Sequence, residues 1–284
     1  MVVVSLFSGL LVGALGLTYK LVSIRRCDAD NFRLMYSWLA ALLVLIAALF
    51  RGESLSNPTV VFWGGLAGAA FLLALIALMK AMELGSVAFT WILVNFSIVI
   101  PILASSTLWS EPVLPGQWLG LGLFMVCVAF FGWGMRSRDT QSKGITIRWL
   151  IFLMLMFLSN GTSLLLLKTI SKKSGSHDFF LPFIPYYAIA TIGFLAIARV
   201  RRAKLPGFGD VKFGLLAAVS ATLGNVLLYV ALSMNAASAL PIVHGGSIIV
   251  VSTGSVMFFG ESFSWPKAIG TLLGLASITL LAST

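Results

Sequence analysis

The stretch LWSEPVLPGQWLG, residues 108–120, sets one acid in a short proline-bearing turn between two apolar runs. The stretch FFGESFSWPKAIG, residues 258–270, has the same design. Each ends a hydrophobic run on aromatic residues, places a glutamate in the turn (Glu111, Glu261) and restarts a hydrophobic run with a glycine (Gly120, Gly270). With only 9 Asp and Glu in the chain, this recurrence indicates a duplicated unit.

The composition is that of a protein embedded in a membrane. The 284 residues are 59% hydrophobic and 10% charged, with a mean hydropathy of +1.03. Apolar runs of roughly 18 or more residues, enough to cross about 30 Å of hydrocarbon, recur along the whole length. We therefore expect an all-α, multi-pass protein of a cell membrane, such as a bacterial inner membrane. Cys27 and Cys127 lack CxxC spacing, so neither a disulfide framework nor a zinc site is predicted.

Glycines, prolines and charge clusters divide the chain into ten predicted helices, five in each half. We expect Pro101 to kink the fourth helix, and Pro182 and Pro185 to kink the start of the seventh. The predicted helices are 2–22, 32–50, 59–82, 86–109, 117–135, 149–170, 179–198, 213–234, 237–259 and 266–283.

The net charge of +10 follows the predicted topology. Of the 19 Lys and Arg, 13 flank connections after odd-numbered helices and 3 lie after even-numbered ones; Lys20, Lys80 and Lys168 lie near or inside helix ends. Positive residues gather in cytoplasmic loops, so the connections after odd-numbered helices are predicted to be cytoplasmic and both termini external. The basicity is thus topological, and nucleic acid is not an expected partner.

Superposing the halves extends the duplication beyond the two glutamates. A shift of 150 pairs Ser97 with Ser247 and Glu111 with Glu261, and a shift of 148 pairs Lys20 with Lys168. The repeats are predicted as 1–136 and 149–284, joined by a basic linker, 137–148. Because five helices are an odd number, the second repeat enters the membrane inverted, an arrangement typical of secondary transporters.

These residues resemble the repeated motif of the drug/metabolite transporter superfamily, specifically its EamA-like ten-helix members. The similarity rests on the turn glutamate after the fourth helix of each half, the Gly-rich fifth helix, the lysine closing the first helix, and Arg33. It implies a bundle whose central cavity is lined mainly by the first, third and fourth helices of each half. Many such proteins have cytoplasmic termini, whereas the charge distribution here places them outside.

Polar and aromatic residues in mid-helix are the candidates for binding substrate. They carry amide, imidazole, indole and phenol groups, which suit a polar, zwitterionic or weakly anionic solute. Hydrogen bonding between helices is the alternative role for each asparagine, and simple packing the alternative for the histidine. The candidates are Trp91, Asn95, Asn160, Asn225, Tyr229 and His244.

A second group of residues has structural or gating roles by prediction. Lys20 and Lys168 end their helices, where they could bond carbonyls of a neighbouring helix or contact substrate. Lys80 and Glu83 are three residues apart, close enough to pair on one helix face. Glu111 and Glu261 precede the fifth helix of each half; we expect them to cap its free N–H groups, with proton coupling as the alternative.

The sequence therefore predicts a carrier that moves a small organic metabolite by alternating access. No converging nucleophile, base or metal-ligand set is present, so we expect no catalytic residues, no metal and no cofactor. A membrane-embedded enzyme or a lipid-handling protein is the alternative. The expected partners are the substrate and the lipid bilayer; substrate identity, transport direction, coupling ion and a homodimeric state stay open.

Overall fold

The computed structural model describes residues 1–25, 27–53, 57–84, 87–111, 113–134, 146–173, 178–203, 205–259 and 265–282, and within these ranges the only regular elements are helices. They are α1 (Val2–Ile24), α2 (Ala29–Phe50), α3 (Pro58–Leu84), α4 (Val87–Phe96), α5 (Val99–Leu108), α6 (Pro115–Gly134), α7 (Ile147–Lys173), α8 (Phe183–Val200), α9 (Phe208–Met234), α10 (Ala236–Phe259) and α11 (Trp265–Ala282).

Most of these helices have the length and apolarity of membrane spans. In the described ranges α1, α2, α3, α7, α8 and α9 are long and apolar enough to cross a bilayer, and shorter apolar stretches lie in α4–α5, α6, α10 and α11. Large apolar side chains such as Phe62, Leu66 and Leu73 of α3 are exposed on the outer surface. A helix satisfies its own backbone hydrogen bonds, which hydrocarbon requires. The architecture fits an all-α, multi-pass membrane protein.

The observed helices match the ten predicted ones, with α4 and α5 together forming the predicted helix 86–109. The helix is interrupted at Ser97–Ile98, so the prediction of a kink at Pro101 understated the distortion. The predicted kinks at Pro182 and Pro185 are wrong. Since α8 begins at Phe183, Pro182 is its N-cap and Pro185 lies in its first turn, where backbone N–H groups have no intrahelical partner.

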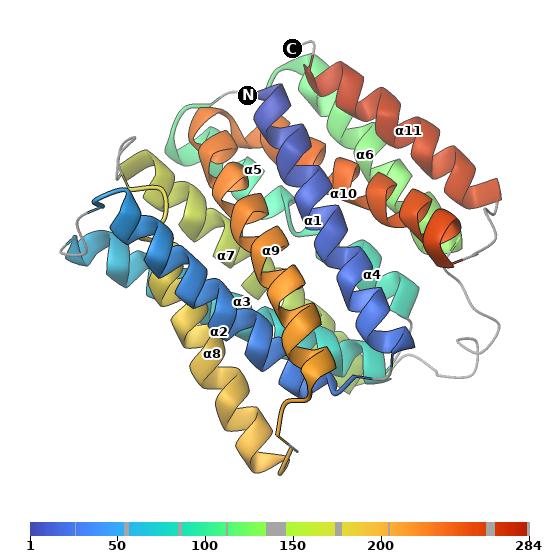
Figure 1. Ribbon diagram of the computed structural model, residues 1–284. Helices are drawn as coiled ribbons and strands as arrows, with labels where there is room; N and C mark the ends of the chain where they lie inside the picture. Colours follow the sequence, from blue (N-terminus) through green and yellow to red (C-terminus); the bar gives the residue numbers. More distant parts are fainter. Residues whose placement is uncertain are drawn as a thin grey trace.

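The most extensive packing joins helices from opposite halves of the chain. α1 packs on α9 and α10, α3 packs on α7 and α8, α2 packs on α8 and α9, and α6 pairs with α11. The pair α6–α11 lies along one side of the bundle, and α2 and α8 lie toward the opposite side (Figure 1). The start of α1 and the end of α11 lie at the same end of the bundle (Figure 1).

Glycines allow the closest approaches between these helices. A β-carbon at Gly68 of α3 would lie 2.5 Å from the carbonyl oxygen of Tyr186 and 2.6 Å from its Cα, both backbone atoms of α8. Small residues at such crossings let two backbones pack directly on each other, as is common in membrane bundles.

We expect Gly68→Ala to lower the thermal stability of the purified protein in detergent, because Tyr186 backbone must move to admit the methyl group. Overpacking of this kind costs about 1–3 kcal/mol. Gly122→Ala is the matched control, since a β-carbon at Gly122 of α6 meets nothing within 4 Å. Equal melting temperatures for the two variants would contradict the close α3–α8 packing.

Candidate functional site

The interruption between α4 and α5 follows from the sequence around Pro101. Proline has no N–H, so the carbonyl of Ser97 loses the donor it would have in a continuous helix. That carbonyl accepts instead from the N–H of Ile100 at 3.1 Å, and Ser97 Oγ donates to the carbonyl of Val94 at 2.6 Å. The side chain of Ser97 thereby stabilises the end of α4.

Asn160 of α7 lies against this interruption. Its Nδ2 donates to Ser97 Oγ at 2.6 Å, so an amide from the second half of the chain binds the broken helix of the first half. Asn95 is buried two residues before Ser97. Discontinuous helices of this kind form substrate and ion sites in many transporters, because unwound backbone groups become available to a ligand. Asn160, Asn95 and Ser97 thus form a candidate site at the break.

Asn225 and Tyr229 of α9 reach a second location, a cluster of aromatic rings. Asn225 Nδ2 donates to the hydroxyl of Tyr187 on α8 at 2.8 Å. Tyr229 packs edge-on against Phe183, with ring centroids 5.8 Å apart. Asn225, like Asn160, therefore makes the hydrogen bond between helices that was the alternative role for each predicted asparagine.

This aromatic cluster contains all five tyrosines of the chain, of which the sequence analysis singled out only Tyr229. Tyr36 contacts Tyr187 and Phe32, and Tyr187 contacts Tyr186 and Phe183. The cluster joins α1, α2, α3, α8 and α9 through eight rings: Tyr19, Phe32, Tyr36, Phe71, Phe183, Tyr186, Tyr187 and Tyr229. Its spacing in sequence was a usable signal, because Phe32–Tyr36 and Phe183–Tyr187 are each four residues apart and share a helix face.

Glu111 and Lys168, predicted separately, form one ion pair. Lys168 Nζ lies 2.8 and 2.9 Å from the two carboxylate oxygens of Glu111, and Lys172 Nζ lies 2.7 Å from one of them. Lys168 also donates to the carbonyl of Leu232 on α9. Its side chain is 0% exposed, so its charge depends on these partners. The network connects the α5–α6 turn of the first half to α7 and α9 of the second.

The expected capping role of Glu111 does not account for these contacts. Its carboxylate is engaged by the two lysines, while Gln117 Oε1 accepts from the N–H of Leu114 at the start of α6. Burial raises the pKa of the Glu111 carboxyl, but hydrogen bonds from Lys168 and Lys172 outweigh it and hold the pKa below its ordinary value of 4.5. The group is therefore a carboxylate at neutral pH.

Glu53 is a buried acidic residue with a capping role that the sequence analysis missed. Its carboxylate, 3% exposed, accepts from the backbone N–H groups of Phe179, Phe180 and Leu181, at 3.1, 2.9 and 2.9 Å. Arg51 lies 3.6 Å from it. The end of α2 thus satisfies the free N–H groups ahead of α8.

The remaining predicted residues have no contact with these clusters that decides their role, or lie outside the described part of the chain. Lys80 Nζ is 2.7 Å from Glu83 Oε2, the pairing predicted from their spacing. Lys20 is partly buried near the end of α1, and His244 is partly buried in α10. Trp91 belongs to α4, but its side chain lies outside the described part, as does Glu261. Among described side chains, no three His, Cys, Asp or Glu residues are grouped closely enough to hold a metal ion.

Comparison with known proteins identifies the fold alone. No protein-family model and no curated protein matches the chain. A solved crystal structure, described only as that of a protein, is similar with a TM-score of 0.79 over 98% of this chain and 94% of the other, at 13% sequence identity.

We expect Glu111→Gln to destabilise the protein strongly, because it leaves the buried ammonium of Lys168 without a counter-charge. Breaking a buried pair from one side costs about 3–5 kcal/mol. Lys172→Met removes a partner whose side chain is 30% exposed and should cost about 1 kcal/mol or less. Thermal unfolding of the purified variants in detergent measures both effects.

The double variant Glu111→Gln/Lys168→Met removes both charges and is the control. It should be more stable than Glu111→Gln alone, since no buried charge is left unpaired and the remaining cation, Lys172, is partly exposed to solvent. Because the folded pKa of Glu111 is lowered, its stabilisation is present above its unfolded pKa and is lost as pH falls through the folded value. Wild-type stability should therefore fall below about pH 4.5 more steeply than that of the double variant. Equal stability of Glu111→Gln and wild type would contradict the pairing.

Proposed function

We propose that this protein is a secondary transporter that moves a small organic metabolite by alternating access between two inverted five-helix repeats. The observation that carries the proposal is a helix contact that occurs twice. In each case the first helix of one half packs, through a glycine, against the fourth predicted helix of the other half. It is supported by the sequence resemblance to EamA-like members of the drug/metabolite transporter superfamily.

The duplicated contact involves a glycine of the first helix in each half. A β-carbon at Gly161 of α7 would come 2.9 Å from both the Ser97 carbonyl oxygen and Ile100 Cβ. A β-carbon at Gly13 of α1 would come 3.2 Å from the carbonyl oxygen of Ser247 and 2.5 Å from Val250 Cβ.

The members of these two contacts correspond through the shifts found in the sequence. Gly13 and Gly161 are 148 residues apart, and Ser97 and Ser247 are 150 apart, as are Ile100 and Val250.

The larger packing pattern agrees with the same exchange of halves. By their order in each half, α1 corresponds to α7, α2 to α8, α3 to α9 and α6 to α11. Exchanging counterparts turns the pair α1–α9 into α7–α3, and the pair α2–α9 into α8–α3. All four pairs are extensive contacts. The pairs α2–α8 and α6–α11 turn into themselves. Two repeats related by a pseudo-twofold axis produce such a pattern, and an axis in the membrane plane is characteristic of inverted-repeat transporters.

The proposed substrate site is the break between α4 and α5, where Asn160 meets Ser97. The aromatic cluster with Asn225 is a second candidate surface. Amide and phenol groups bind polar, zwitterionic or weakly anionic solutes. Rocking of one repeat against the other would expose the site to each side of the membrane in turn. The Glu111–Lys168 network would hold the two halves together at the end of the bundle where both termini lie.

A thermal-shift screen of the purified protein with amino acids, nucleosides, sugars and phosphorylated metabolites should identify a ligand. A ligand that binds only the folded state adds about 2.7 kcal/mol at a hundredfold excess over Kd. Asn160→Ala should abolish the shift. Ser106→Ala is the control, because this hydroxyl bonds within its own helix, to the carbonyl of Leu103.

The identified ligand should then exchange across the membrane of liposomes that contain the protein. Labelled ligand outside should accumulate in vesicles preloaded with unlabelled ligand, and Asn160→Ala should not support this counterflow. Binding without any exchange, by protein that is folded and inserted, would contradict transport.

The proposed orientation has its own test, because it differs from that of many EamA-like proteins. A green fluorescent protein fused after residue 142, in the basic linker, should fluoresce, and alkaline phosphatase fused after residue 55 should be active. These outcomes follow from the positive charge near the connections after odd-numbered helices. The reverse pattern would place the termini in the cytoplasm.

A further inference from the structure

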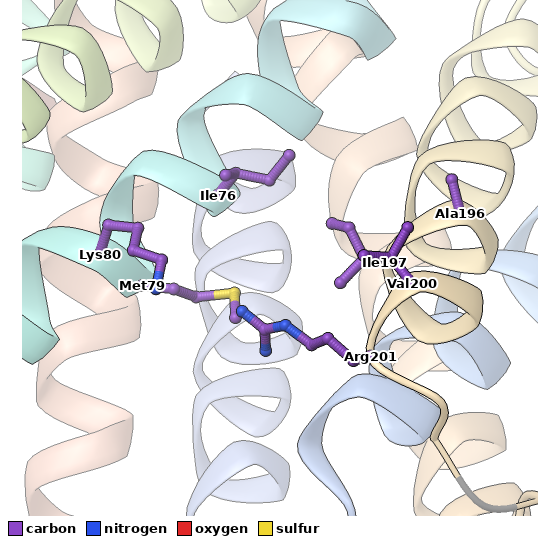
Figure 2. A pocket seen from close by; sticks show the side chains of 7 residues that line it. All are labelled: Ile76, Met79, Lys80, Ala196, Ile197, Val200 and Arg201. Carbon is purple, nitrogen blue, oxygen red and sulfur yellow. The ribbon is translucent and has the colours of Figure 1, made fainter.

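A groove opens between the C-terminal ends of α3 and α8, and none of its lining residues belongs to the break or the aromatic cluster. It has a volume of about 300 Å³, at the small end for pockets that hold organic molecules. Most of its wall is apolar. The lining residues are Ile76, Met79, Lys80, Ala196, Ile197, Val200 and Arg201 (Figure 2).

Two cations stand at the end of this apolar groove. Figure 2 shows the side chain of Arg201 extending from the end of α8 toward Met79 of α3, with Lys80 beyond it. Their side chains are 43% and 40% exposed, so both remain accessible to a ligand. One wall of the groove is open as well, since Ala196 and Val200 are exposed.

Carboxylates hold these cations in place without cancelling their charge. Glu83 pairs with Lys80 at 2.7 Å, and Asp30 pairs with Arg201 at 2.9 Å. Asp30 is shared with Arg33, 3.3 Å away. Three cations against two carboxylates leave a net positive charge at the mouth of the groove.

We infer that this groove binds an anionic phospholipid, with part of an acyl chain against the apolar wall and the phosphate between Lys80 and Arg201. The chemistry of the groove matches both ends of such a lipid. Each Lys or Arg near a membrane surface attracts anionic lipid by about 1 kcal/mol, and basic pockets between membrane helices bind phosphate headgroups. An acyl chain can pack against the apolar wall by van der Waals contact. The inference does not rest on the proposed transport function.

Native mass spectrometry tests this inference. The detergent-purified protein is titrated with phosphatidylglycerol or with phosphatidylcholine that has the same acyl chains. Wild type should bind phosphatidylglycerol more tightly. Each cation is expected to strengthen phosphatidylglycerol binding about fivefold. The double variant Lys80→Gln/Arg201→Gln should therefore weaken this binding about 25-fold. Arg199→Gln/Lys212→Gln, which removes two exposed charges from the same end of the bundle outside the groove, should leave it unchanged.

A second variant pair tests the acyl-chain wall without altering charge. Ala196→Trp fills the groove from an exposed position and should weaken binding of both lipids, whereas Ile192→Trp, exposed one turn away on α8 and outside the lining, should not. Equal affinity of wild type for the two lipids would overturn the headgroup assignment. Unchanged lipid binding by folded Ala196→Trp would overturn the groove as the site.

Discussion

Each half of this chain depends on the other for its core. The helices of one half find their most extensive contacts in the other, so neither half buries its polar and small-residue faces alone. Hydrocarbon supplies no hydrophobic force between helices, which makes close packing and interhelical hydrogen bonds the main attractions. Serines provide such bonds across the halves: Ser8 Oγ donates to the carbonyl of Gly224 at 2.7 Å, and Ser163 Oγ to that of Ala67 at 2.9 Å. The close packing at Gly68 and Gly161 has the same function.

Helix number and approximate position could be predicted because apolar length is a strong signal in a membrane protein. Helix starts were less accurate, although the capping residues were in the sequence. α2 begins at Ala29 rather than 32, since Asp28 Oδ1 accepts from the N–H groups of Asp30 and Asn31. α9 begins at Phe208 rather than 213, with Asp210 Oδ2 accepting from the N–H of Gly207. Polar residues that the hydropathy pattern assigned to loops were helix caps.

The candidate site was predicted as a set of residue types, but its pairings were not. Repetition marked both Glu111 and Lys168, yet these residues are 57 positions apart and belong to different halves. Only the inter-half packing of α7 beside the α5–α6 turn brings them together. The same limit applies to Asn160 and Ser97, which are 63 positions apart. Of the tyrosine cluster only Tyr229 was predicted, although the i, i+4 spacing of Phe32 and Tyr36 is visible in the sequence.

The described ion pairs gather at the two ends of the bundle. At one end Glu111 pairs with Lys168 and Lys172, and Glu53 caps the start of α8. At the other end Asp30 joins Arg33 to Arg201, and Lys80 pairs with Glu83. Between them the described contacts are neutral hydrogen bonds and aromatic packing, which cost little to rearrange compared with a buried ion pair. If the protein alternates as proposed, the energetic barrier lies in its ends, and the buried Lys168 makes the Glu111 end the more costly to open.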